Sequence, residues 1–200
     1  MADSLLLNFK HHPEERKAIA DLILAYGDLE SSLLNLLQAA LNGDTYTAVR
    51  AMYRVRSESN RLEIVDALVT PRLAEQKLDG AWGEAYAAMK CCMGIRNRYA
   101  HSQWLHDDGE LRFGNLDEAA NKKGPKCKIV MLPLSAGVLT EQRRYFEYAH
   151  HQINWIGDRY RLATDQKRLT KARIPKPKRI SPPRLDSRGE ARPRRLSSQG

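Results

Sequence analysis

The feature that most constrains this chain is a helical repeat of apolar residues in its first quarter. Apolar side chains recur every three or four positions between Glu14 and Leu41, which corresponds to about seven turns of α-helix. The repeat comprises Ile19, Leu22, Ile23, Tyr26, Leu29, Leu33, Leu36, Leu37 and Ala40. Because so long an apolar stripe must be buried against other helices, the sequence predicts a helical bundle.

Four further helices are predicted from the same periodicity and from local start and stop signals. They span residues 44–56, 59–69, 80–101 and 135–163. The helix over 44–56 begins at the capping residue Asp44 and is expected to bury Val49, Met52 and Tyr53. The helix that follows it is expected to stop before Pro71, because a proline disfavours the helical conformation of the residue before it.

A change of period after residue 101 predicts a small β insertion. Asp108-Gly109 is a strong two-residue hairpin signal, and a third short strand is predicted over residues 128–132. The apolar residues that flank the hairpin turn are Trp104, Leu105, Leu111 and Phe113. The expected fold class is therefore mainly α, a four- to five-helix bundle with a small β-hairpin or three-strand insertion before the last long helix and a disordered C-terminal tail.

The positive charge of the chain is concentrated in residues 165–200. This segment holds twelve Lys or Arg against three acids, which accounts for the whole net charge of +9, and it holds five of the nine prolines. With few apolar residues to offset the entropy of ordering, we expect a helical domain over 1–164 and a disordered basic Pro/Arg-rich tail over 165–200. The tail residues expected to contact nucleic acid are Lys167, Arg168, Lys171, Arg173, Lys176, Lys178 and Arg179. A purely solubilising tail is the alternative.

Several classes of protein are not expected from this sequence. No stretch approaches the ~18 apolar residues of a membrane span, no leader segment is expected, and three cysteines without paired spacing predict reduced thiols, so a cytoplasmic protein without membrane contact is expected. The sequence also contains no phosphate-binding glycine loop, zinc-ligand spacing or nucleophile elbow. Neither a cofactor nor a metal is expected. The histidine pair His11-His12 is interpreted as an exposed pair or a helix flank.

Charged residues on the apolar stripe of a helix indicate where a site is located, because a charge there needs a partner. On the helix over 80–101, Arg96 falls about 40° to one side of the stripe through Trp82 and Met89, and Asn97 about 60° to the other side. His101 stacks beside Asn97, about 140° from Arg96, so the two converge only if the arginine bends or the helix loosens near its end.

Glu30 is the matching charge on the first helix. It falls on the same face as the apolar residues Ile19 and Leu37, and the first helix must pack against another helix. We therefore expect Glu30 to form an ion pair with Arg96. This pair is either part of a functional site or only a structural link between two helices.

The string Arg96-Asn97-Arg98-Tyr99-Ala100-His101 resembles the R-x4-6-H signature of the HEPN superfamily, with four residues between Arg96 and His101 and Asn97 in the polar position. Its place near the end of a long helix, followed by one more long helix, is also similar to that family. The resemblance implies a HEPN-like domain over 1–164 and metal-independent cleavage of RNA by attack of the ribose 2′-OH on the adjacent phosphate.

The resemblance also implies roles for three residues of the motif and for Glu30. His101 would be the acid/base group and Arg96 the phosphate clamp, while Asn97 would fix the histidine tautomer or bind the backbone and Glu30 would orient Arg96. Active members of the family pair as homodimers. Such an enzyme would be a toxin or defence effector that acts on RNA. An antitoxin or a nucleotidyltransferase is the expected further partner.

Two other functions remain open on the sequence. The first is a non-catalytic HEPN-like interaction or RNA-binding module, which would tolerate loss of His101. The second is an RNA-binding scaffold that acts through residues 165–200, for which the motif would be irrelevant.

Overall fold

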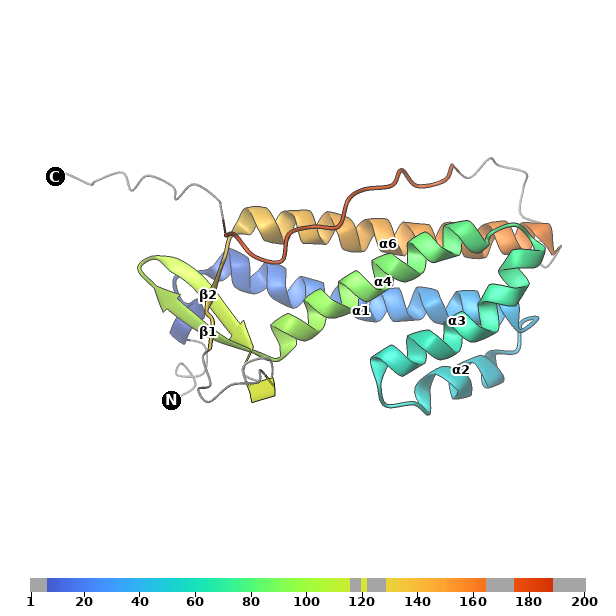
Figure 1. Cartoon of the computed structure of the whole chain (residues 1–200), viewed down its shortest axis with the longest axis horizontal. Coiled ribbons are helices and arrows are strands. Elements are labelled where there is room, and N and C mark those ends of the chain that lie inside the picture. The colour runs from blue at the N-terminus through green and yellow to red at the C-terminus, as the bar shows by residue number, and fades with distance from the viewer. Residues whose placement is uncertain (1–6, 116–119, 122–128, 165–174, 189–200) are drawn as a thin grey trace.

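The computed structural model describes residues 7–115, 120–121, 129–164 and 175–188, and the described chain is mainly helical (Figure 1). It contains a 3-10 turn at Leu7–Phe9, the helices α1 (Pro13–Ala40), α2 (Thr45–Tyr53), α3 (Glu58–Glu75), α4 (Asp79–Ala100) and α6 (Ala136–Ala163), and the strands β1 (Ser102–Asp107), β2 (Glu110–Asn115) and β3 (Leu132–Leu134). A three-stranded sheet thus precedes the last helix, and the predicted fold class is confirmed. No helix in the described ranges is long and apolar enough to cross a bilayer.

The core lies where the long helices α1, α4 and α6 meet, with α2 and α3 at one end of the molecule and the sheet at the other (Figure 1). The predicted stripe of α1 is buried except at Ile23, which is partly buried. Fully buried side chains of the core include Leu22, Leu29, Leu33, Leu36, Leu37, Trp82, Met89 and Ile95. Because each buried Leu contributes about 1.5–3 kcal/mol, these side chains stabilise the packing of the long helices, among them α4, which bears the motif.

Helix α3 differs from its prediction at Pro71. It does not stop before this proline but continues through it to Glu75. A proline inside a helix costs about 3 kcal/mol because it removes one backbone hydrogen bond. The turn after it carries Leu73, which is fully buried, and this packing offsets the cost.

Helix α2 differs from its prediction in which side chains it buries. Met52 is buried as expected, but Val49 is 38% exposed and Tyr53 is 45% exposed. The short helix touches α1 and α3 on one side only, through Ala48 and Met52. Its apolar stripe is therefore wider than the surface that α1 and α3 cover.

The sheet is antiparallel in the order β1-β2-β3 and is joined to the end of α4 by aromatic packing. Asp108 and Gly109 both adopt positive φ, at 48° and 79°, as the predicted two-residue hairpin turn requires. The predicted third strand is found at Leu132–Leu134 rather than over 128–132, and residue 128 lies outside the described ranges. The ring of Tyr99 lies 5.7 Å from Trp104 and 5.5 Å from Phe113, which fixes the C-terminal end of α4 on the sheet.

Residues 175–188 form an extended segment that runs along α6 (Figure 1). The segment has no helix or strand, as expected for the tail, but these residues contact the helices. Lys176 pairs with Glu84 of α4 at 3.1 Å, and Arg184 pairs with Glu141 of α6 at 2.8 Å. These contacts are polar, so a count of apolar residues does not reveal them. The predicted RNA contacts Lys167, Arg168, Lys171 and Arg173 lie outside the described residues.

Candidate functional site

An open cleft of about 320 Å³ separates the C-terminal half of α4 from the connection between α2 and α3. Its lining consists of Arg56, Ser57, Glu58, Ser59, Met93, Arg96, Asn97 and His101. The structure thus brings together the three motif residues that the sequence singles out on α4. Four further polar residues join them from a segment that is distant in sequence.

His101 reaches this cleft because α4 ends one residue earlier. The helix stops at Ala100, and His101 is its C-cap, with φ −111° and ψ 13° and with its backbone N–H donating to Asn97 O at 3.1 Å. The helix therefore ends at the position where His101 has to leave it in order to approach Arg96. The imidazole is exposed, and within the described residues no other side chain forms a hydrogen bond or ion pair with it. It is free to contact a ligand.

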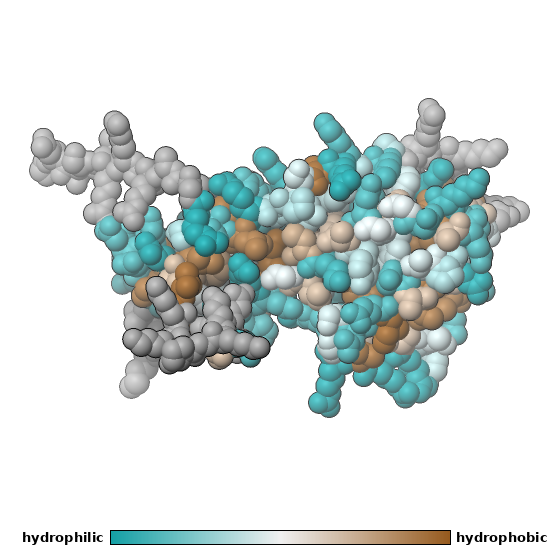
Figure 2. Space-filling model, in the orientation of Figure 1, coloured by the Kyte–Doolittle hydropathy of each residue, from teal (hydrophilic) through white to brown (hydrophobic). Residues whose placement is uncertain are grey.

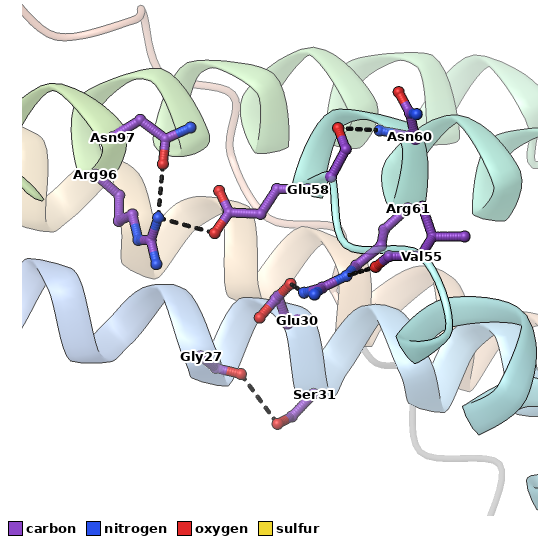
Figure 3. Close-up of polar contacts among 10 residues, drawn as sticks. Gly27, Glu30, Ser31, Val55, Glu58, Asn60, Arg61, Arg96 and Asn97 are labelled. Atoms are coloured by element: carbon purple, nitrogen blue, oxygen red, sulfur yellow. Dashed lines mark hydrogen bonds and ion pairs between the residues drawn. The ribbon is translucent and has the colours of Figure 1, made fainter. Parts of the chain in front are cut away.

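Three helices position the guanidinium group of Arg96. Its Nη1 donates to Glu58 Oε1 at 2.8 Å and to Asn97 Oδ1 at 2.7 Å (Figure 3). Its Cζ lies 5.7 Å from the ring centroid of Tyr26 on α1. Asn97 thus contacts the arginine, whereas its predicted role was to fix the His101 tautomer or to bind a backbone.

The predicted ion pair between Glu30 and Arg96 is wrong. Glu30 Oε1 accepts a hydrogen bond from Arg61 Nη1 at 3.0 Å, and Glu58 takes the place beside Arg96 (Figure 3). Helices α1 and α4 do pack together, as the helical-wheel argument required. The first turns of α3 supply Glu58 and Arg61 to the same group of charged side chains. A helical wheel identifies the buried face of a helix, but it does not show which neighbouring helix contacts that face.

The cluster around Arg96 is incompletely satisfied. Glu58 Oε2 and Arg96 Nε are buried and have no hydrogen-bond partner among the described residues. Each such atom costs about 1–3 kcal/mol, so the arrangement is retained at the expense of stability. Burial raises the pKa of Tyr26 well above its usual range, and the carboxylates of Glu58 and Glu30 raise it further, so this phenol stays neutral beneath the guanidinium.

Sequence reasoning missed Arg56, Ser57, Glu58 and Ser59, because it started the third helix at residue 59. Ser57 is the N-cap of α3, and its hydroxyl accepts from Asn60 N at 3.4 Å. A serine two residues earlier than the predicted start was the available signal for this cap. Recognising it would have placed Glu58 in the first turn of α3, near the other long helices.

The described basic residues of the tail lie elsewhere. Lys176 is engaged with Glu84, and its Nζ lies 6.0 Å from the ring centroid of Trp155, while Lys178 and Arg179 are exposed. The contacts of this segment with Glu84, Trp155 and Glu141 involve no residue of the cleft lining. Across the described ranges, no cluster of three His, Cys, Asp or Glu residues could hold a metal ion.

Comparison of the chain with protein-family models, with curated proteins and with solved structures finds no match. The resemblance to the HEPN superfamily therefore depends on the six-residue motif and on the helical architecture around it. The function has to be argued from the cleft itself.

Proposed function

We propose that the chain is a metal-independent HEPN-like endoribonuclease and that the cleft lined by Arg96, Asn97 and His101 is its active site. The observation that carries this proposal is that a free imidazole and a guanidinium held by helix contacts line the same open cleft. Imidazole exchanges protons near neutral pH, and guanidinium stabilises the negative charge that develops on a phosphate. Cleavage of RNA by its own 2′-OH needs these two properties.

The reaction proceeds by transfer of the phosphate from one sugar oxygen to another. His101 removes the proton of the ribose 2′-OH, the O2′–P bond forms, and the P–O5′ bond breaks. The leaving 5′ oxygen takes up a proton, which gives a 2′,3′-cyclic phosphate and a 5′-hydroxyl. Arg96 contacts the phosphate, and Arg56 adds a second guanidinium to the lining. In the structure the contacts of Arg96 with Glu58 and Asn97 both use Nη1, which leaves Nη2 for the substrate.

The cleft contains one imidazole of the motif, that of His101. The reaction needs a base that accepts the proton of the 2′-OH and an acid that donates a proton to the leaving 5′ oxygen. A homodimer would bring a second His101 to the substrate, as in the active members of the family that the motif resembles. Ribonuclease activity of this kind is expected of a toxin or defence effector. An antitoxin or a nucleotidyltransferase would then be the partner that restrains it in the cytoplasm.

A non-catalytic HEPN-like interaction module is the second candidate function. The contacts of Arg96 with Glu58 and Asn97 favour it, because these contacts also suit an arginine that only joins α3 to α4. The two candidates differ at His101. A binding module has no need of this exposed imidazole, whereas the ribonuclease does.

The experiment that tests the proposal is incubation of the purified full chain with single-stranded RNA in EDTA, followed by identification of the product ends. We expect fragments with 2′,3′-cyclic phosphates or their hydrolysis products, and no cleavage of the same sequence made with 2′-deoxy sugars. Cleavage of the deoxy substrate would contradict a reaction in which the 2′-OH is the nucleophile. No cleavage of any of a varied set of RNAs would favour the binding module.

A further inference from the structure

Helix α2 exposes an apolar and aromatic face that no part of the described chain covers. Tyr46 is 68% exposed, Val49 38% and Tyr53 45%. Residues three, four and seven positions apart lie on the same side of a helix, so these three side chains form one stripe. Figure 2 shows brown, hydrophobic residues bordered by hydrophilic ones at this end of the molecule.

Arginines accompany both tyrosines of the stripe. The Cζ of Arg50 lies 5.0 Å from the ring centroid of Tyr46, and Arg50 also donates to the hydroxyl of that tyrosine. The Cζ of Arg61 lies 5.4 Å from the ring centroid of Tyr53. Residues 45–56 contain three arginines and no acidic residue. The face is therefore both aromatic and positively charged.

The stripe leads directly into the cleft. Arg54 follows α2 and is exposed, and Arg56 lines the cleft. The connection between α2 and α3 is held in shape, because Arg61 Nε donates to Val55 O at 2.7 Å while its Nη1 donates to Glu30 (Figure 3). A ligand that extends along α2 would thus arrive at Arg56, next to Glu58 and Arg96.

We infer that α2 and its connection to α3 bind single-stranded RNA, with bases stacked on Tyr46 and Tyr53 and phosphates at Arg50, Arg54 and Arg56. Aromatic rings interleaved with cations suit a polyanion whose bases have flat faces, and the absence of acids from this segment removes like-charge repulsion. The two tyrosines are separated by about 10 Å along the helix, which a few nucleotides span. The inference rests on the proposed function for the choice of RNA, and it adds how the strand approaches the cleft.

The test measures binding of a fluorescein-labelled 12-nucleotide 2′-O-methyl RNA to the full chain by fluorescence anisotropy. The methyl group blocks the nucleophile, so binding is measured without cleavage. We expect Tyr46→Ala with Tyr53→Ala to weaken binding at least about fivefold, and the pair Tyr46→Phe with Tyr53→Phe, which keeps both rings, to stay near wild type. Leu24→Ala is the matched control, because Leu24 is 72% exposed on α1 and outside the stripe.

The salt dependence of RNA binding tests the same surface independently. Arg50→Gln with Arg54→Gln should lower the slope of log Kd against log salt by about 0.7 for each phosphate that an arginine no longer neutralises. Absence of binding by the wild-type chain, or a double alanine variant within twofold of wild type, would overturn the inference. A change in self-association without a change in RNA binding would also overturn it and identify the face as a protein interface. Binding that depends on the tyrosines in a chain that cleaves no RNA would refute the proposed function alone.

Discussion

The two sides of α4 are built differently. On the cleft side, Glu58 and Arg96 each bury a polar atom without a partner among the described residues, and the imidazole of His101 faces solvent. On the side that faces α6, the buried amide of Gln142 accepts from Tyr99 Oη at 2.6 Å and donates to Arg184 O at 2.8 Å. Residues 175–188 cover the second side, whereas none of the described segments closes the first.

This difference separates groups that hold α4 from groups that a ligand can use. Tyr99 lies inside the motif, but its hydroxyl is committed to Gln142 and its ring to the sheet. These contacts give Tyr99 a role in packing. Of the six motif positions, Arg96, Asn97 and His101 line the cleft.

Of the substitutions that compare the two sides of α4, Arg96→Ala should have the largest effect, and it tests the open side. Loss of the guanidinium that stabilises the phosphate should lower the rate of RNA cleavage by about 10²–10³-fold. Arg96→Lys should restore only part of this rate, because an ammonium group cannot reproduce the planar contacts of the guanidinium. The measurement is a single-turnover rate, with Arg72→Ala, an exposed arginine of α3, as the control. An unchanged rate in Arg96→Ala would show that α4 contributes no phosphate clamp.

The closed side should respond in stability instead. Gln142→Ala removes two buried hydrogen bonds and leaves the Tyr99 hydroxyl and the Arg184 carbonyl unsatisfied, so it should lower the free energy of unfolding by about 2–4 kcal/mol. Tyr99→Phe removes only one of the two bonds and should cost less. Denaturant unfolding measures both variants. Equal stability of Gln142→Ala and wild type would mean that residues 175–188 do not hold α6 as described.

A smaller and pH-dependent effect is expected at the sheet end of α1. His12, interpreted as part of an exposed pair or a helix flank, is the N-cap of α1 and is only 7% exposed. Its Nε2 lies 2.8 Å from His106 Nδ1. Burial lowers the pKa of His12 from its ordinary value of 6.5, and the neighbouring His106 and His11 lower it further, while Glu15 opposes them.

The unfolded chain therefore takes up a proton at His12 near pH 6.5, whereas the folded chain does so only at lower pH. The stability that this group contributes is present above pH 6.5 and is lost as the pH falls through the lowered pKa. His12→Gln should flatten the dependence of the unfolding midpoint on pH below 6.5. A slope identical to that of wild type would assign the effect to another group.

The smallest effect is expected at the exposed end of the C-terminal segment. The side chains of Arg184 and Glu141 are 47% and 43% exposed, so their ion pair should contribute less than about 1 kcal/mol. Glu141→Gln should therefore change the unfolding midpoint far less than Gln142→Ala does, although the two residues are adjacent. A larger effect of Glu141→Gln would mean that the ion pair, and not the buried amide, holds the segment.

Local features of the sequence predicted much of this fold. The stripe of α1, the Asp108-Gly109 turn and the start of α6 near residue 135 depend on neighbours within a few residues, so they are visible in the sequence. The partner of Arg96 was not predictable in this way, because Glu58 comes from another helix. The position of residues 175–188 depends on Glu84 and Glu141, which are also distant along the chain.

The measurement that tests the central claim most directly is the single-turnover rate of RNA cleavage by His101→Ala in EDTA. If His101 is the acid/base group, the rate should fall by about 10²–10⁴-fold while unfolding stays cooperative. His151→Ala, which removes an exposed histidine of α6, should keep the wild-type rate. Equal rates for wild type and His101→Ala would contradict the account.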